Sequence, residues 1–352
     1  MPNSPTVSVV TPTLNQAHFL EWTLASVRDQ SYPVIEHIVI DGGSTDATLG
    51  ILDREGRRGT LSWRSGPDTG MYQAVNKGIA QAKGEVLAYL ASDDVWFPWA
   101  VDAVMAIFAA KPDVDLVFGD GIKVREDNGD QRLRLFTPFD RLSLASFESL
   151  MQPAVFWRRR LLDRIGGFDE SMRFVADLDY WLRAAAAGAR IAHLDEVIAV
   201  ERIHPGRLSD AQKDTMAAED TGMRARHVGD AGGPQGRARA VRREERWQRW
   251  LWVRFMTAYA VPGVGGWRRF IRDGLVTVKS KRVLAGSEPG AQHKVLWNAV
   301  TSARAAQLLG ASVNPPKRRP RLKRVRARVG LLKQALPHLV AARRALRSAQ
   351  TD

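Results

Sequence analysis

Short apolar, β-rich runs alternate with segments of helical periodicity over the first 120 residues of the chain. The runs that predict β-strands are residues 7–10, 35–40, 61–63, 86–90 and 114–118. Apolar residues also recur every three or four positions, and the helices predicted on that basis include residues 19–27, 71–82 and 96–110. Residues 35–40 are apolar on both faces apart from His37, as expected of a parallel strand covered on both sides. The alternating order therefore predicts a doubly wound, mostly parallel α/β sheet.

Polar loops follow the predicted strands, at the ends where ligands of open α/β sheets bind. The first strand is followed by residues 11–15, where Asn15 is placed to cap the next helix. The second strand is followed by residues 41–46, whose glycines allow a ligand to approach the backbone closely. Ser44 or Thr45 in this second loop is expected to cap the helix after it.

The fourth predicted strand ends in two adjacent carboxylates, Asp93 and Asp94. Neighbouring side chains on an extended segment point in opposite directions, so the two carboxylates can serve different purposes. One can bind a sugar hydroxyl and the other a hard divalent cation, because such cations are commonly held by one or two carboxylates together with substrate phosphates. An exposed loop is the alternative interpretation, and the rest of the chain decides between the two.

The composition excludes several classes of protein. There is no cysteine, which excludes disulfides, thiolate metal sites and cysteine nucleophiles and fits a reducing compartment. The dinucleotide-binding Gly-x-Gly-x-x-Gly motif and the P-loop motif are both absent from the sequence. The N-terminus lacks the features of a signal peptide, and no apolar run approaches the roughly 18 residues of a membrane span. We therefore expect a cytoplasmic protein.

Charge divides the chain into two parts. Residues 1–209 hold 22 Lys and Arg against 28 Asp and Glu, a net charge of −6, whereas residues 210–352 hold 30 against 10, a net charge of +20. Such asymmetry is typical of a catalytic body with a basic tail that binds an anionic surface. We expect a catalytic domain at residues 1–210, a linker at residues 211–236 and a basic, mainly helical region at residues 237–352.

The basic region combines arginine with tryptophan. Trp247, Trp250 and Trp252 lie among arginines, and residues 317–328 form a basic run. Helices of this composition lie in membrane interfaces, and basic runs are attracted to anionic lipid, so peripheral association with the inner face of the membrane is expected. The alternatives are a helical appendage with a charged, exposed end and, least favoured, nucleic acid, because no motif that reads DNA or RNA accompanies the basic run.

Four motifs occur one after another within the first 94 residues. They are Val-Ser-Val-Val-Thr-Pro-Thr-Leu-Asn (7–15), Ile-Asp-Gly-Gly-Ser-Thr-Asp (40–46), Gly-Pro-Asp-Thr-Gly-Met-Tyr-Gln-Ala-Val-Asn-Lys-Gly (66–78) and Ser-Asp-Asp (92–94). Segments at 152–153, 166–170, 177–183 and 203–209 extend the pattern. Each motif alone is weak, but the ordered set resembles glycosyltransferase family 2, the nucleotide-sugar transferases with a GT-A fold. The resemblance covers about residues 6–209.

The resemblance implies a role for each matched position. The residues implied to bind the donor are Thr11, Pro12, Thr13, Asn15, Asp41, Asp68, Lys77 and Asp93. Asp41 would accept a hydrogen bond from the nucleoside base, whereas Lys77 also fits an exposed helix position. Asp93 would face the ribose or the donor sugar, and Asp94 would bind Mn²⁺ or Mg²⁺.

Three later residues are implied to take part in the chemistry. Asp177 matches the first Asp of the family's Glu-Asp-x-Asp pattern, with Ala176 in place of Glu, and is the implied general base. Asp179 is the alternative base, and either carboxylate also suits a helix N-terminus without catalysis. His204, in a His-Pro-Gly turn, is implied to bind the metal or the diphosphate, or else is a loop residue.

These features predict an inverting glycosyltransferase that moves a sugar from a nucleoside-diphosphate sugar to an acceptor hydroxyl. The acceptor would be a glycan or a lipid-linked molecule in bacterial-type surface polysaccharide or lipid-linked glycan synthesis, which suits the basic tail. A noncatalytic sugar-nucleotide-binding or membrane scaffold protein is an alternative, although Asp94 and Asp177 are both retained. A nucleotidyltransferase would need a Gly-rich phosphate loop with a basic residue, which residues 11–15 lack.

Overall fold

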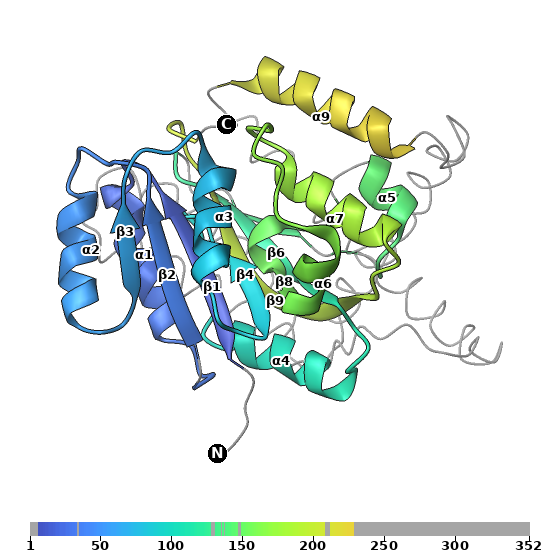
Figure 1. The fold of residues 1–352 in the computed structure, drawn as a ribbon, viewed down its shortest axis with the longest axis horizontal. Coiled ribbons are helices and arrows are strands. Elements are labelled where there is room, and N and C mark those ends of the chain that lie inside the picture. The colour runs from blue at the N-terminus through green and yellow to red at the C-terminus, as the bar shows by residue number, and fades with distance from the viewer. Residues whose placement is uncertain are drawn as a thin grey trace, which may run out of the picture.

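The computed structural model describes residues 6–228 except for 34, 128–130, 135, 137, 147–148 and 208–211. In these residues a single mixed sheet is covered by helices (Figure 1). The strands are β1 Val7–Thr13, β2 Ile35–Asp41, β3 Ser62–Ser65, β4 Val86–Tyr89, β5 Val95–Trp96, β6 Leu116–Arg125, β7 Gln131–Arg134, β8 Val155–Arg158 and β9 Ile191–Ile203. The helices are α1 Ala17–Arg28, α2 Thr48–Arg57, α3 Met71–Gln81, α4 Ala100–Ala110, α5 Arg141–Ser146, α6 Arg159–Ile165, α7 Ala176–Ala186 and α9 Lys213–Val228, with a 3₁₀ turn at Gln152–Ala154.

The sheet has a parallel half and a mixed half. Its strand order is β3-β2-β1-β4-β8-β6-β9-β5, and β7 pairs with β6. β1 pairs in parallel with β2 and β4, and β2 pairs in parallel with β3. β8 runs antiparallel to both β4 and β6 and so joins the two halves. The predicted doubly wound α/β fold is confirmed, and the antiparallel pairings of β5, β7 and β8 are added in the second half.

Helices cover both faces of the parallel half. Val10 and Ile38 are register partners, and Gly78 of α3 lies so close to Val10 that a Cβ atom at position 78 would collide with the valine side chain. Val39, the next residue of β2, points to the opposite face. The side chains packed with it are Leu20 and Leu24 of α1 and Ile51 and Leu52 of α2. The sequence thus forms a strand that is apolar on both faces because helices lie on both sides.

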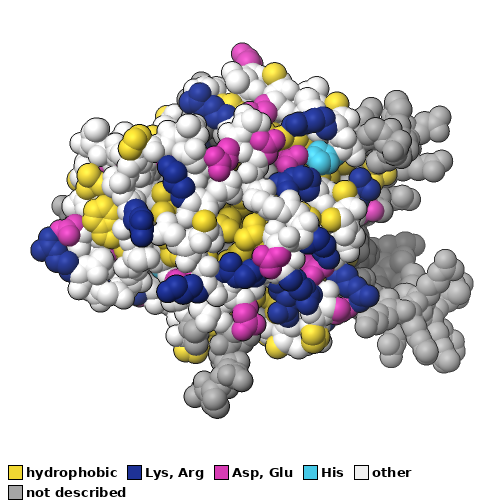
Figure 2. Space-filling view, viewed as in Figure 1, with side chains coloured by type: hydrophobic (Ala, Val, Ile, Leu, Met, Phe, Trp, Pro, Cys, Tyr) yellow, Lys and Arg dark blue, Asp and Glu magenta, His cyan; other side chains and the backbone are white. Residues whose placement is uncertain are grey.

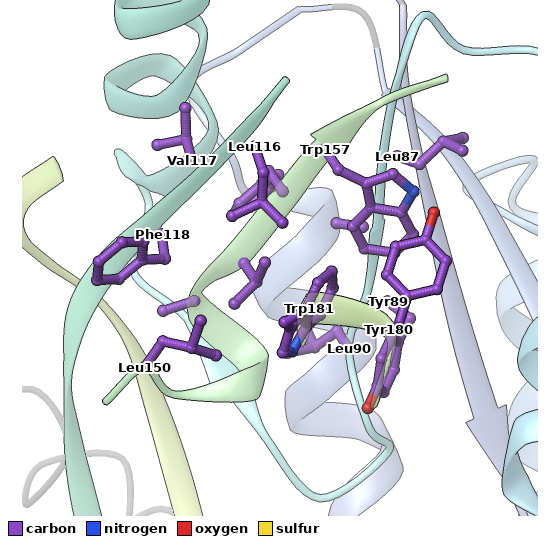
Figure 3. Packing of buried hydrophobic residues seen from close by; sticks show 14 of the residues in the cluster. Leu87, Tyr89, Leu90, Leu116, Val117, Phe118, Leu150, Trp157, Tyr180 and Trp181 are labelled. Carbon is purple, nitrogen blue, oxygen red and sulfur yellow. The ribbon is translucent and has the colours of Figure 1, made fainter. Parts of the chain in front are cut away.

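An aromatic cluster holds α7 against the sheet. Figure 3 shows Trp157 of β8 close to Tyr180 and Trp181 of α7. The ring centroids of Tyr180 and Trp181 lie 5.7 and 5.4 Å from that of Trp157, and all three side chains are buried. The Phe168 ring lies 5.5 Å from Tyr89, the last residue of β4, and 4.5 Å from Tyr180. The packing therefore places α7 beside the carboxyl end of β4.

Two predicted helix caps are wrong. The N-cap residues are Gln16 for α1 and Ala47 for α2. Asn15, which has a positive φ of 52°, instead accepts the N–H of Thr45 at 2.8 Å, and Ser44 Oγ accepts the N–H of Asn15 at 2.7 Å. The two loops bind each other across about 30 residues of sequence, and such a contact cannot be read from local pattern.

Two boundaries in the middle of the domain also differ from prediction. The predicted helix at residues 96–110 begins later, at Ala100, because Val95 and Trp96 form the short strand β5 against β9. The strand predicted at residues 114–118 extends to Arg125 as β6, which pairs with β7 in a hairpin.

The predicted linker at residues 211–236 is wrong over α9. This helix lies along α5 and α7 (Figure 1), and its Met223 is fully buried in the main core. Residues 213–228 therefore belong to the folded domain. The predicted basic region at residues 237–352 lies outside the described residues. In the part of the chain that the structure describes, none of the helices has the length and apolar character needed to cross a bilayer.

Candidate active site

The carboxyl ends of β1, β2 and β4 bring three of the sequence motifs to one edge of the sheet. β1 lies between the other two strands, so the loops that follow all three are neighbours. The N–H of Gly42 donates to the carbonyl of Thr13 at 2.9 Å, and the N–H of Leu90 donates to the carbonyl of Val10 at 2.9 Å. This edge is where open α/β sheets bind ligands.

Asp41 organises the loop that follows β2. It is fully buried, and its Oδ2 accepts the N–H groups of Gly43 and Ser44 at 3.0 and 2.9 Å. The hydroxyls of Ser44 and Ser65 donate to the same carboxylate. Both oxygens of Asp41 therefore shape the loop, and direct contact with a nucleoside base stays a prediction.

The residues of β1 predicted to line the nucleoside pocket differ in environment. Thr11 and Pro12 are buried, and Thr11 Oγ1 lies 2.9 Å from His37 Nε2 inside the fold. Asn15 is exposed, and its side chain binds the loop at Thr45. Thr13 is 5 % exposed, and its hydroxyl has no hydrogen-bond partner among the described residues. Of this group, Thr13 thus presents an unpaired polar group at the end of the strand.

Asp68 lies against the loop that Asp41 shapes. A Cβ atom on Gly42 would be 2.7 Å from Asp68 Oδ2, so a larger residue at this position would displace the Asp68 carboxylate. Asp68 Oδ1 accepts the N–H of Gly70 at 3.0 Å, and the exposed Lys77 donates to the carbonyl of Pro67 at 3.2 Å. The predicted donor residues Asp41 and Asp68 are therefore brought together, while Lys77 lies on the surface of α3.

Asp93 is the carboxylate that meets His204. Asp93 Oδ2 lies 3.1 Å from His204 Nε2, and the two side chains are 15 % and 7 % exposed. A carboxylate and an imidazole at this distance can share one divalent cation. Among the described residues there is no cluster of three or more His, Asp and Glu side chains suited to a metal ion.

Arg202 anchors the end of β9 from which His204 projects. Its guanidinium is 1 % exposed, lies over the rings of Phe19 at 5.5 Å and Trp22 at 6.0 Å, and donates to Glu126 at 2.7 Å. The Phe19 ring also contacts His204, with 4.4 Å between the ring centroids. Helix α1 thus fixes the imidazole beside Asp93.

Asp94 binds the backbone of β9. It is 3 % exposed, and its Oδ1 accepts the N–H of Arg202 at 2.9 Å. Burial raises the pKa of the Asp94 carboxyl well above its usual range, and the carboxylates of Asp93 and Glu201 raise it further while Arg207 lowers it. Asp94 thus contacts the backbone of β9 while Asp93 lies beside His204, and the predicted metal role of Asp94 and donor role of Asp93 stay predictions.

Arg207 adds a positive charge next to the two aspartates. Burial lowers the pKa of its guanidinium, but Glu201, Asp94 and Asp93 together raise that pKa above its ordinary value. Arg207 forms an ion pair with Glu201, whose other oxygen lies 3.1 Å from Lys123 Nζ. The side chain is therefore a permanent cation in the loop that carries His204.

Asp177 lies in the first turn of α7 between two tyrosine hydroxyls. The hydroxyl of Tyr72 is 3.1 Å from Asp177 Oδ1, and that of Tyr89 is 3.5 Å from Asp177 Oδ2. The Tyr72 hydroxyl is also 2.9 Å from the carbonyl of Phe174. A phenol has one proton and can donate to one of these two acceptors at a time. When Asp177 is protonated it can donate to Tyr72, so the arrangement accommodates a proton on Asp177.

The two tyrosines remain neutral in this setting. Burial raises the pKa of Tyr72 and of Tyr89 well above the ordinary value, and the charge of Asp177 raises both further. The charge of Asp94 also raises the pKa of Tyr89.

Asp179, the alternative base, is engaged in the fold. It is 5 % exposed, with Oδ2 at 2.7 Å from Arg183 Nε and Oδ1 at 2.7 Å from His227 Nε2. Of the two carboxylates on α7, Asp177 is therefore the one that faces the tyrosines.

Sequence reasoning did not single out Tyr72, Tyr89 and Arg207. Each lies inside a stretch that was recognised, in the 66–78 motif, the central strand and the 203–209 motif. A polar hydroxyl on an otherwise apolar helix face or strand was the available signal for the two tyrosines. Their partner lies 105 and 88 residues further along the chain, so the contact itself could not be predicted.

Comparison with known proteins places the chain in a family. The family described as Glycosyl transferase family 2 matches residues 8–166. An uncharacterized glycosyltransferase of Mycobacterium tuberculosis is 38 % identical over 188 residues, which cover 53 % of this chain and 71 % of the relative. A PGL/p-HBAD biosynthesis glycosyltransferase of Mycobacterium bovis is 32 % identical over 212 residues, covering 59 % and 80 %. The protein is a glycosyltransferase that depends on a nucleotide sugar. It belongs to glycosyltransferase family 2.

Solved structures share the fold. TarS 1–349 of S. aureus, in complex with UDP-GlcNAc, has a TM-score of 0.51 at 20 % identity and covers 64 % of this chain and 74 % of that one. The mannosyltransferase PcManGT from Pyrobaculum calidifontis, in complex with GDP-Man and Mn²⁺, has a TM-score of 0.51 at 18 % identity and covers 89 % of both chains. At these identities the likeness shows the fold alone, and it confirms the predicted GT-A type.

Proposed function

We propose that this enzyme transfers a sugar from a nucleoside-diphosphate sugar to an acceptor hydroxyl with inversion at the anomeric carbon. The observation that carries the proposal is the Asp177 carboxylate, framed by the Tyr72 and Tyr89 hydroxyls. Tyr89 lies on the strand that leads to Asp93, so the proton acceptor and the end of the site proposed to hold the cation and the diphosphate lie on connected elements. Direct transfer to a hydroxyl needs both.

The donor would bind across the ends of β1, β2 and β4. The unpaired hydroxyl of Thr13 and the carboxylate of Asp68 lie beside the loop shaped by Asp41, which suits the nucleoside part of a donor. Arg207, a half-buried cation within electrostatic range of Asp93, suits the diphosphate. These groups support a donor orientation with its phosphates toward β9.

Asp93 and His204 would hold Mn²⁺ or Mg²⁺. Their polar atoms lie 3.1 Å apart, and both side chains are largely buried but not sealed from solvent. Two protein ligands fit a cation whose other ligands are water and donor phosphates. When bound, the cation supplies positive charge that stabilises the departing diphosphate.

Asp177 would act as general base in a single displacement. The acceptor hydroxyl passes its proton to Asp177 while its oxygen forms the bond to the anomeric carbon. The bond between that carbon and the diphosphate oxygen breaks, and the diphosphate leaves with the electron pair. Tyr72 can receive a hydrogen bond from protonated Asp177 while donating to the carbonyl of Phe174.

A lipid-linked or surface glycan is the acceptor class that we favour. The M. bovis relative is named for PGL/p-HBAD biosynthesis, and the basic, Trp-rich residues 237–352 suit a lipid surface. Peripheral membrane association belongs to the same proposal.

The test is nucleoside diphosphate release from a panel of nucleotide sugars with Mn²⁺. We expect slow hydrolysis of one donor, lost in EDTA and lost in Asp93→Asn. The matched variant Asp94→Asn should keep its dependence on Mn²⁺ and instead lower the melting temperature, because it weakens the hydrogen bond to Arg202. Diphosphate release by the wild type without a divalent cation would refute the proposed metal site. If Asp94→Asn lost release while Asp93→Asn kept its dependence on Mn²⁺, Asp94 would be the metal ligand instead.

A further inference from the structure

Helix α9 reaches the catalytic helix α7 through polar side chains. α9 lies beyond the residues that match the family, which end at residue 166, and it packs along α5 and α7 (Figure 1). Met223 anchors it in the core, and Glu219 and His227 project from it toward α7. Those two side chains contact the two ends of the first turn that carries Asp177.

Glu219 accepts hydrogen bonds from the backbone that leads into α7, where the N-cap side chain itself makes none. The N-cap residue of α7 is Val175, whose apolar side chain cannot accept a hydrogen bond. Glu219 Oε1 accepts the N–H groups of Phe174 and Val175 at 2.8 and 2.9 Å, and Oε2 accepts that of Arg173 at 2.9 Å. A carboxylate at a helix N-terminus is also favoured by the helix dipole.

The segment 173–175 is held from two sides. Glu219 binds its N–H groups, and the Tyr72 hydroxyl lies 2.9 Å from the carbonyl of Phe174. Asp177 follows two residues after Val175, and its Oδ1 is 3.1 Å from the same Tyr72 hydroxyl. A shift of this segment would therefore move Asp177 relative to Tyr72.

His227 contacts the other end of the first turn of α7. Its Nε2 lies 2.7 Å from Asp179 Oδ1, while Arg183 binds the other oxygen of Asp179 at 2.7 Å. α9 thus holds the backbone just before α7 through Glu219 and the buried face of the first turn of α7 through His227.

We propose that Glu219 is a positioning residue for the base Asp177, acting through the backbone of residues 173–175, and that α9 is part of the catalytic unit of this enzyme. The proposal rests on the function assigned to Asp177 above. A general base must hold its carboxylate within a fraction of an ångström of the acceptor hydroxyl, so loss of the cap lowers turnover without changing donor binding.

The experiment compares Glu219→Ala, Glu219→Gln and the control Asp214→Asn in the full-length protein. Asp214 is an exposed carboxylate in the first turn of the same helix. Glutamine keeps one acceptor oxygen. The increase in hydrogen exchange should therefore be largest in Glu219→Ala, smaller in Glu219→Gln and smallest in Asp214→Asn. Hydrogen exchange of peptides covering residues 172–178 should accelerate about tenfold or more in Glu219→Ala.

Turnover of the nucleotide sugar found in the panel is the second measurement. We expect kcat to fall about 10- to 100-fold in Glu219→Ala and less in Glu219→Gln, with unchanged donor KM. Unchanged hydrogen exchange of residues 172–178 in both Glu219 variants would refute the proposal that Glu219 holds this backbone. Faster exchange with wild-type kcat overturns the positioning role alone. If the wild type releases diphosphate from none of the nucleotide sugars, the proposed function is refuted, and the positioning role of Glu219 is refuted with it. The hydrogen-exchange data would still show whether Glu219 holds the backbone before α7.

Discussion

Asp93 and Asp94 are neighbours in the chain, yet their carboxylates lie in different environments, one beside His204 and one on the backbone of β9. Asp177 and Asp179 differ in the same way, because two residues along a helix are about 200° apart around its axis. Local geometry therefore separates the two members of each pair, so that they meet different partners. The sequence could identify each pair, but the choice within a pair depends on partners more than 45 residues away, such as His204 and His227.

Tyr72 provides the first prediction at this scale. Tyr72→Phe removes the hydroxyl that lies between Asp177 and the carbonyl of Phe174. We expect kcat to fall about tenfold, because protonated Asp177 loses a hydrogen-bond acceptor, while the donor dissociation constant stays unchanged. Steady-state kinetics and donor titration check it. A Tyr72→Phe variant with wild-type kcat would show that the Tyr72 hydroxyl does not assist proton transfer to Asp177.

At the scale of elements, the parallel strands and their helices follow from sequence because their hydrophobic periodicity is local. The positions of α5 and α9 do not follow from the sequence, because their contacts are not local. Glu219 of α9, for example, binds backbone groups about 45 residues away. The short strand β5 could not be predicted, because a strand of two residues is too short to show a hydrophobic periodicity. The cap residues Asn15 and Ser44 were misassigned since each loop satisfies the other.

The buried His37 on β2 gives a prediction for this scale. Burial lowers its pKa from 6.5 to about 3, so the folded protein keeps it neutral where the unfolded chain binds a proton. Its contribution to stability is therefore complete above pH 6.5 and decreases as the pH falls toward 3. At pH 5 the loss is about 2 kcal/mol relative to neutral pH.

Urea unfolding at pH 7.5 and pH 5 measures this effect. The decrease in unfolding free energy between the two values should be smaller in His37→Gln than in the wild type by roughly that amount. The exposed His18→Gln serves as the control and should keep the wild-type decrease. An equal decrease in all three proteins would contradict the buried neutral imidazole.

At the scale of the whole molecule, charge is distributed unevenly. Figure 2 shows Lys and Arg interspersed with Asp and Glu on the visible face of the described domain. Residues 229–352, in contrast, hold 27 Lys and Arg against 6 Asp and Glu, a net charge of +21. The composition of that region could be read from sequence, whereas the inclusion of residues 213–228 in the folded domain could not, because tertiary contacts hold α9 in place.

Truncation tests this division. A chain that ends after Val228 should keep its melting temperature and lose binding to anionic vesicles, because each Lys or Arg near the surface contributes on the order of 1 kcal/mol at low salt. A chain that ends at residue 212 should be less stable, since it lacks the buried Met223. Vesicle sedimentation and thermal unfolding check both. Equal sedimentation of the full-length and shortened proteins would refute a lipid-binding tail.

The most direct test of the catalytic account is Asp177→Asn, with diphosphate release and donor binding measured on the same protein. We predict that release falls by about 10²- to 10⁴-fold while the donor dissociation constant is unchanged, because a base acts on the acceptor in the transition state. Asp179→Asn is the matched variant, and it should lower the melting temperature through its lost pairing with Arg183 and His227 but retain turnover when folded. Wild-type release by Asp177→Asn, together with loss of release in folded Asp179→Asn, would contradict the account and move the base to Asp179.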